Sequence, residues 1–248
     1  MELIGKTAIV TGGNGGLGRV ISEYLAKEGV NVAIVYAKSK IEAEEFSSEL
    51  SADYVKSKAF QCDLTSEKDI NDLVASVKET FGRVDFLVND AAYNVWIPFQ
   101  DIESLTLDEW EKILATNLTG PMLLTKAVSS VMKMNGGRII NISSVAGLSP
   151  TGSSIPYAVS KAGLIHLTKC MAVALAPDIL VNCIAPGYLE GTRATANLAV
   201  EYQEKARVAS ILEKAADKED IAKQVVSLFA TDTITGQTLV VDSGRVFH

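Results

Sequence analysis

Short apolar runs alternate with longer stretches of helical spacing along most of the chain. A short apolar run bounded by glycine or polar residues predicts a strand, and apolar residues recurring every three or four positions predict a helix. The predicted strands are 6–11, 30–36, 55–62, 84–89, 138–143, 179–184 and 238–241. The predicted helices are 17–28, 40–50, 66–81, 107–118, 120–134, 156–176 and one near 218–229.

This alternation predicts the fold class. Strands that are apolar on both sides, each followed by a helix, indicate right-handed crossovers and a parallel sheet covered on both faces. We therefore expect a doubly wound α/β fold, a Rossmann domain with a parallel seven-stranded sheet. No linker divides the chain, so we expect a single dinucleotide-binding and catalytic domain over 1–248. The segment of about 187–213 has weak periodicity and is expected to be an irregular, mobile substrate loop.

Composition and charge exclude several classes of protein. An apolar content of 48% and a charged content of 21% are typical of folded globular proteins. The net charge of −7 argues against nucleic acid as a partner. The longest charge-free stretch, 139–160, holds six serines, two prolines and two glycines, so no membrane span is predicted.

The cysteine and histidine usage points to a cytoplasmic protein without a metal. Three cysteines form no CxxC pair, which favours reduced thiols over disulfides or zinc. Residues 1–5 are too few for a signal peptide before the first strand. With His166 and His248 as its only histidines, the chain lacks the ligands for a histidine-based metal site and the parts of a Ser-His-Asp hydrolase.

A glycine-rich turn joins the first predicted strand to the first predicted helix, in the run Thr11-Gly12-Gly13-Asn14-Gly15-Gly16-Leu17-Gly18. Glycines there let the backbone turn tightly and let a phosphate approach the positive end of the helix. A nucleoside triphosphate loop is the alternative. Arg19-Val20 replaces the Lys-Ser/Thr pair that such a loop needs, so we exclude ATP hydrolysis and expect a dinucleotide.

The end of the second predicted strand bears on the choice of dinucleotide. An acid at this place binds the adenosine ribose in NAD sites, but this chain has Tyr36. Lys38 and Ser39 supply a cation and a donor suited to a 2′-phosphate. NADP(H) is therefore favoured, and NAD(H) stays open because Lys38 is also typical of a solvated loop charge.

Tyr157 and Lys161 stand four residues apart at the start of a predicted helix and so share a face. An ammonium beside a phenol lowers its pKa from about 10 towards the range of acid/base catalysis. Ser144 follows the strand 138–143, at the sheet edge where a carbonyl substrate would bind.

Together these residues resemble the short-chain dehydrogenase/reductase family, in its 3-oxoacyl-carrier-protein reductase branch, over essentially the whole chain. The resemblance lies in Thr11-Gly12-x-x-x-Gly16-x-Gly18, Cys62-Asp63-Leu64-Thr65, Asn89-Asp90-Ala91-Ala92, Asn117, Asn141-Ile142-Ser143-Ser144, Tyr157-x-x-x-Lys161 and Pro186-Gly187. It implies an oxidoreductase that interconverts a carbonyl and an alcohol, and a homotetramer formed through 107–134 and 156–176. The favoured NADP(H) indicates that the enzyme works as a reductase, since cells keep that cofactor largely reduced.

The resemblance also implies the roles of individual residues. The catalytic set is Asn117, which holds a water, Ser144, which positions the substrate oxygen, Tyr157, the acid/base, and Lys161. The expected cofactor-binding residues are Gly12, Asn14, Gly15, Gly16, Leu17, Gly18, Tyr36, Lys38, Ser39, Asp63, Leu64, Asn89, Ala91, Tyr157, Lys161, Pro186, Gly187 and Thr192. Asp63 as a helix cap and Asn89 as a backbone partner are the structural alternatives.

Three positions depart from the family pattern. Asp90 and Ala92 stand where the family usually has asparagine and glycine, which places a carboxyl and a methyl near the expected cofactor path. Ser243 replaces a common glycine, and we expect this change in the turn to be neutral.

The substrate is a small carbonyl or alcohol compound whose identity stays open. Apart from Ser144 and Tyr157, the expected contacts at the mouth of the site are Tyr93, Trp96 and Tyr188, which could equally pack a lid or a subunit contact. A different class of function is a catalytically silent module that senses NADP. The complete Ser, Tyr, Lys and Asn set argues against it, since a sensor needs no proton relay. A nucleotide-sugar dehydratase or epimerase is disfavoured because the chain lacks room for a further substrate domain.

Overall fold

Seven parallel strands form one sheet at the centre of the molecule. The computed structural model describes residues 1–52, 55–192, 195 and 200–247. The strand order is β3-β2-β1-β4-β5-β6-β7, as a doubly wound sheet requires, so the predicted fold class is confirmed. The strands are β1 (Thr7–Thr11), β2 (Asn31–Tyr36), β3 (Ser57–Gln61), β4 (Phe86–Asn89), β5 (Gly137–Ile142), β6 (Ile179–Pro186) and β7 (Thr238–Val241).

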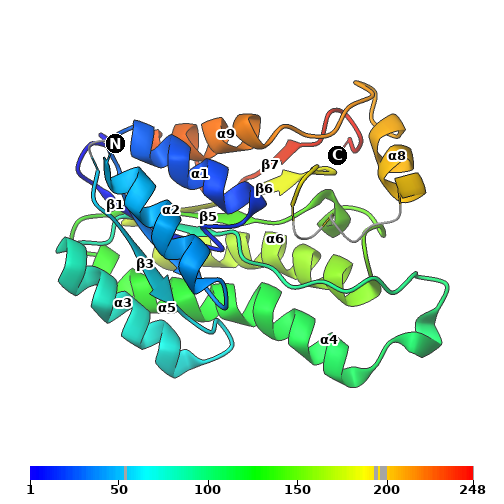
Figure 1. Cartoon of the computed structure of the whole chain (residues 1–248), viewed down its shortest axis with the longest axis horizontal. Coiled ribbons are helices and arrows are strands. Elements are labelled where there is room, and N and C mark those ends of the chain that lie inside the picture. The colour runs from blue at the N-terminus through cyan, green and yellow to red at the C-terminus, as the bar shows by residue number, and fades with distance from the viewer. Residues whose placement is uncertain (53–54, 193–194, 196–199, 248) are drawn as a thin grey trace.

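Helices cover both faces of the sheet. Helices α1, α2 and α9 pack on one face, and α3, α5 and α6 pack on the other (Figure 1). The helices are α1 (Gly16–Lys27), α2 (Lys40–Ala52), α3 (Glu67–Phe81), α4 (Leu107–Leu114), α5 (Gly120–Met132), α6 (Ile155–Leu175), α8 (Val200–Val208) and α9 (Lys218–Ala230). Shorter turns are η1 (Ile102–Ser104), η2 (Ala115–Thr119) and η3 (Val145–Gly147).

Alternate residues along the strands pack into two separate hydrophobic cores. In β1, Val10 belongs to the core under α1 and α9, whereas Ile9 belongs to the core above α3 and α5. This two-sided burial follows from the period of two along a strand. The first core also holds Phe86 and Phe229, whose rings stack at 4.4 Å between centroids. The sheet is therefore fixed from both sides, and its carboxyl edge is a rigid base for a site.

The two helices predicted at 107–118 and 120–134 form one continuous helical run. Helix α4 passes through the π-helical turn η2 into α5 without leaving helical geometry. Pro121 lacks the N–H that the carbonyl of Asn117 would accept, and a proline ring crowds the carbonyl four residues earlier. A widened turn accommodates this crowding. Both predicted helical stretches are therefore present, and they are joined by a change of helix type at 115–119.

The segment expected to be an irregular loop, about 187–213, contains the helix α8. Its sequence is rich in strong helix formers such as Glu, Gln, Lys, Ala and Arg, but it lacks an apolar face. Periodicity of apolar residues therefore missed it. Residues 193–194 and 196–199 of the same segment lie outside the described part of the chain. The expected mobility of this segment stays a prediction.

Helix α6 is long and apolar enough to cross a membrane by length and composition, unlike any other helix in the described part of the chain. Leu164 and Thr168 of this helix are buried in the protein. The helix also buries Lys161, which a core helix supports only when a partner is at hand. Its sequence is thus explained by packing within the fold.

Candidate active site

A cavity of about 1050 Å³ runs along the carboxyl ends of the strands. Open parallel sheets bind their ligands at this edge, because the loops after successive strands meet there. The cavity wall includes these residues predicted for the site: Gly12, Asn14, Gly15, Gly16, Leu17, Tyr36, Lys38, Ser39, Asp63, Leu64, Ala91, Tyr93, Ser144, Tyr157, Lys161, Pro186, Gly187, Tyr188 and Thr192. It does not include Gly18, Asn89, Trp96 or Asn117.

The glycine-rich turn forms the wall between β1 and α1. Gly15 precedes the first residue of α1 with no side chain over the helix end. Gly12 has a φ of +65°, and a Cβ there would come within 3.3 Å of Ala91 Cα. Gly18 lies inside α1, where a Cβ would collide with the carbonyl of Gly12. The missing side chain at Gly18 thus lets α1 pack closely against the turn. The backbone amides at the start of α1 remain accessible to an anion.

Ser144, Tyr157 and Lys161 come together at the middle of the cavity. Ser144 follows β5 and its Oγ accepts the N–H of Ala146 at 3.1 Å, which begins the turn η3. Tyr157 and Lys161 lie in the first turns of α6, which Ser154 caps. The Lys161 ammonium lies 5.8 Å from the centroid of the Tyr157 ring. The predicted shared face of tyrosine and lysine is therefore present.

Lys161 is buried and held in one position. Its Nζ donates a hydrogen bond to the carbonyl of Ile142 at 2.8 Å, and the residue is only 3% exposed. Burial lowers the pKa of Lys161 to about 8, and the carboxyl of Asp90 opposes this shift. Since that value lies above neutral pH, the side chain keeps most of its positive charge beside the Tyr157 ring.

Asp90 gives this site an acid that the family usually lacks. Its backbone N–H donates to Thr11 Oγ1 at 3.0 Å. Burial raises the pKa of its carboxyl to about 7, while the Lys161 charge and the N–H of Gly18 oppose the shift. Ala92 is not among the described non-glycine residues with positive φ, so the local backbone needs no glycine there.

Asn117 lies behind the cavity wall. Its Oδ1 accepts the N–H of Tyr93 at 2.8 Å, and its Nδ2 donates to the carbonyl of Tyr93 and to Ser160 Oγ. The side chain therefore anchors the Tyr93 backbone, which the motif alone did not indicate. Pro121 leaves the main-chain carbonyl of Asn117, in the turn η2, without its ordinary α-helical partner.

Asn89 is also structural in its contacts. It is buried, and its Nδ2 donates to Asn141 Oδ1 at 2.8 Å. Asn141 in turn donates to Thr168 Oγ1 at 2.9 Å. This chain of side chains links β4 to β5 and to α6. The partner of Asn89 Nδ2 is thus a side chain, whereas the structural alternative named backbone groups.

The end of the cavity away from Ser144 and Tyr157 lies at the carboxyl ends of β2 and β3. Tyr36 is buried at the end of β2, and Lys38 is exposed just after it. Asp63 Oδ1 accepts both the N–H and the hydroxyl of Thr65, and these bonds lower the pKa of Asp63. Ser66 is the cap of α3, so the alternative role of Asp63 as that cap is not what the structure has.

The mouth of the cavity contains residues that sequence reasoning missed. Tyr93 and Tyr188 line it as expected, whereas Trp96 is 44% exposed outside it. The missed residues include Asn94, Lys112, Ala206 and Arg245. Arg245 follows the carboxyl end of β7, so the rule that ligands meet strand ends could have found it. Lys112 and Ala206 lie on helices and had no such signal.

Comparison with known proteins decides the family. Residues 6–203 match the family model described as short chain dehydrogenase. The chain belongs to the short-chain dehydrogenase family. It is therefore an oxidoreductase, as the resemblance of the motifs predicted.

Relatives of this short-chain dehydrogenase extend over nearly its whole length. The 3-oxoacyl-(acyl-carrier-protein) reductase FabG of Aquifex aeolicus is 35% identical over 249 residues, covering 98% of both chains. The 3-oxoacyl-(acyl-carrier-protein) reductase of Synechocystis sp. is 34% identical over 257 residues, again covering 98% of both. A dehydrogenase/reductase structure from Sinorhizobium meliloti 1021 superposes with a TM-score of 0.92 at 30% identity, covering 99% of this chain and 98% of that one.

Proposed function

We propose that this short-chain dehydrogenase is an NADPH-dependent reductase that converts a ketone to an alcohol, with 3-oxoacyl thioesters as the first substrates to test. The observation that carries the proposal is the placement of Ser144, Tyr157 and Lys161 on one cavity wall, next to the glycine-rich turn. The relatives named as 3-oxoacyl-carrier-protein reductases support the substrate class.

The cavity fits a nicotinamide dinucleotide. Its glycine turn offers bare backbone amides to a diphosphate, and Gly12 lets this turn pack closely against Ala91. Gly12, Asn14, Gly15, Gly16 and Leu17 would hold the diphosphate. Asp63, Leu64 and Ala91 would border the adenosine, and Lys161, Pro186, Gly187 and Thr192 would border the nicotinamide. When bound, the nicotinamide supplies the hydride for the reduction.

The protein supplies a proton and an oriented carbonyl. Ser144 Oγ and the Tyr157 hydroxyl hold the substrate oxygen, and Tyr157 gives it a proton as negative charge develops. The charged Lys161 makes that proton easier to lose by stabilising the phenolate. We infer that a water at the main-chain carbonyl of Asn117 returns the proton through Lys161.

Tyr157→Phe tests this mechanism. We expect it to lose most of the turnover, by a factor of about a hundred or more, because the general acid is absent. NADPH binding should stay close to that of the wild type. Tyr24→Phe, which removes the hydroxyl of a partly buried tyrosine on α1 outside the cavity, is the matched control. Full turnover in Tyr157→Phe would refute the assignment.

The preference for NADPH rests on Lys38 and Ser39. Both line the cavity where the adenosine would lie, and Tyr36 brings no carboxylate to repel a 2′-phosphate. Titration with NADPH and NADH tests the preference. Lys38→Gln should weaken NADPH binding about tenfold and leave NADH unchanged, whereas Lys40→Gln, which removes a lysine paired with Glu44, should change neither. Equal binding of both cofactors by the wild type would refute the preference.

The silent NADP sensor is the second candidate, and it predicts tight NADPH binding with no turnover on any carbonyl. A panel of ketones with the wild-type protein separates the two.

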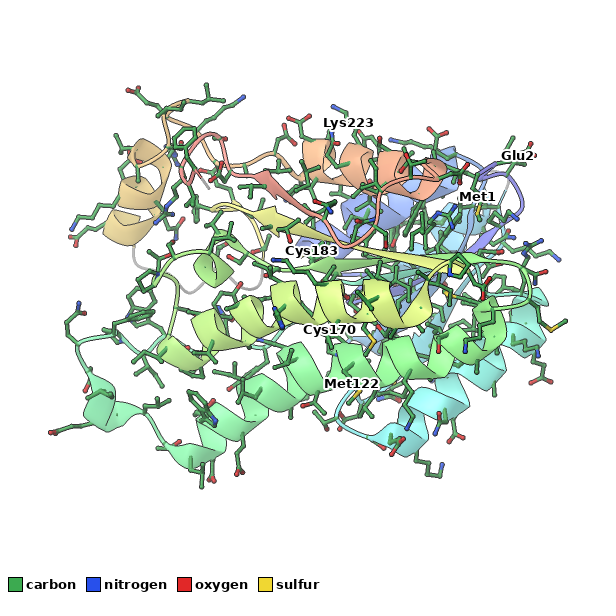
Figure 2. All side chains as sticks on the ribbon, turned by 180° about the vertical axis from the view of Figure 1, so that it is seen from behind. Met1, Glu2, Met122, Cys170, Cys183 and Lys223 are labelled. Carbon is green, nitrogen blue, oxygen red and sulfur yellow. The ribbon has the colours of Figure 1, made fainter. Side chains whose placement is uncertain are left out.

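We further propose a homotetramer in the cytoplasm. Exposed apolar side chains on α4 and α6, namely Leu107, Val159 and Val173, support association through these helices. Cys62, Cys170 and Cys183 are free thiols, and Figure 2 shows Cys170 on α6 and Cys183 on β6, which fits a reducing compartment. Light scattering measures the oligomer. A monomer at micromolar concentration would contradict this assembly.

A further inference from the structure

The turn after β7 carries Arg245 into the cavity in a fixed backbone setting. Asp242 Oδ1 accepts the N–H of Gly244 at 2.9 Å, and its Oδ2 accepts the N–H of Val246 at 2.7 Å. The carbonyls of residues 243 and 244 accept N–H bonds from residues 211–212. The backbone on both sides of Arg245 is therefore held, and the side chain is partly buried on the cavity wall.

The position of Arg245 separates it from the adenosine end. Lys38 follows β2, on one side of β1, whereas Arg245 follows β7, the edge strand on the other side. Tyr188 and Ala206 of the substrate segment line the same cavity. In Figure 1 the C-terminal end likewise lies near α8, away from β3. Arg245 is thus placed to meet the substrate and not a 2′-phosphate on the adenosine.

The substrate end of the cavity is cationic in a protein of net charge −7. Among the described cavity residues that segments 93–116, 144–157 and 187–245 contribute, the charged ones are Lys112 and Arg245, with no carboxylate. Lys112 lies 4.0 Å from the centre of the Tyr93 ring, and the Tyr93 hydroxyl lies 3.1 Å from Glu109, which balances that charge. In the described part of the chain, no acidic side chain pairs with Arg245.

We infer that Arg245 binds an anionic group, a carboxylate or a phosphate, that the substrate carries at a distance from its reacting carbonyl. The inference rests on the proposed reductase function and deepens it. A guanidinium presents a planar set of donors that fits either oxyanion with two hydrogen bonds. A partly buried cation that no described acidic side chain neutralises gains most from a ligand of opposite charge.

Three probes with matched 3-oxoacyl groups, two thioesters and one ester, test the inference. Their reduction is followed by NADPH consumption. The neutral probe is the N-acetylcysteamine thioester, the phosphate probe is the pantetheine 4′-phosphate thioester, and the carboxylate probe is a 3-oxo dicarboxylic half-ester. Arg245→Gln should raise KM about tenfold or more for an anionic probe and leave the neutral probe unchanged. Arg245→Lys should restore part of the loss. Lys214→Gln, an exposed lysine outside the cavity, is the control with the same charge change.

The pattern of responses identifies the anion. A response confined to the phosphate probe assigns a phosphate, and one confined to the carboxylate probe assigns a carboxylate. Equal KM changes for neutral and anionic probes would overturn the inference, because they would indicate a structural or subunit-contact role for Arg245. A wild type that treats all three probes alike would overturn it too.

A binding measurement distinguishes a failure of the anion-site inference from a failure of the reductase proposal. Calorimetry of pantetheine 4′-phosphate and of glutarate, each with wild type and Arg245→Gln, requires no turnover. If no probe is reduced but an anion binds in an Arg245-dependent way, the proposed reaction fails and the anion site stands. If neither anion depends on Arg245, the anion site is refuted whatever the enzyme reduces.

Discussion

The carboxyl of Asp90 makes a contribution to the stability of this protein that becomes less favourable as pH rises. Its pKa is raised from 3.8 to about 7 in the folded state, chiefly by burial. Below about pH 4 the group is neutral in both the folded and the unfolded chain and costs nothing. Between that value and pH 7 the unfolded chain ionises first, so the folded state loses stability up to about 4 kcal/mol.

Asp90→Asn removes this cost and keeps an acceptor for the N–H of Gly18. We expect the variant to gain stability over the wild type as pH rises, by about 2 kcal/mol between about pH 5.5 and 8.5. Urea denaturation of the cofactor-free protein at these two pH values measures it. Asp108→Asn, at an exposed position on α4, is the matched control. If the free energies of unfolding of the wild type and Asp90→Asn changed by the same amount between the two pH values, the reasoning would be refuted.

The same variant has a kinetic consequence. The carboxylate of Asp90 raises the pKa of Lys161, which burial alone would bring below about 8. Because Lys161 loses its proton as pH rises through that value, we expect kcat/KM for reduction to fall on the alkaline side. In Asp90→Asn this alkaline limb should lie at lower pH. An unmoved limb would show that Asp90 does not act on Lys161.

Two further predictions concern packing and the turn after β7. Phe229→Ala removes a ring that is fully buried and stacked on Phe86. It should reduce the free energy of unfolding, measured by urea denaturation, by about 3–5 kcal/mol. A loss below about 1 kcal/mol would contradict the packing described. Ser243→Gly should raise the free energy of unfolding by about 0.5–1 kcal/mol. Ser243 has a φ of 58°, a left-handed conformation that costs a serine about 1 kcal/mol and a glycine little. No gain in thermal stability would contradict this expectation.

For Ser243, the sequence expectation and the backbone point in different directions, and the stability of Ser243→Gly would decide between them. The change from the family's glycine was expected to be neutral, yet the backbone is left-handed at this position. Only the path of the chain reveals that strain. The Ser243 hydroxyl donates to the carbonyl of Ala215 at 3.2 Å, which offsets part of the cost.

The sheet and most of the cavity wall could be predicted because they follow from local patterns. A strand that is apolar on both sides, a glycine turn and a Tyr-x-x-x-Lys spacing each specify their own geometry. The parallel sheet then brings the strand ends to one edge. Contacts that depend on packing between distant segments could not be predicted. The anchoring of Tyr93 by Asn117 is one such contact, and the place of Lys112 on the cavity wall is another.

The strand order has a consequence for how the protein is assembled during synthesis. Strands β1, β2 and β3, with the glycine turn and Lys38, leave the ribosome well before β7 and the turn at 242–246. A nascent chain can therefore complete the dinucleotide end of its pocket while the substrate end is still open. Proteolytic trimming beyond Val241 would remove Arg245, and with it the proposed anion site, while the glycine turn and Lys38 remain.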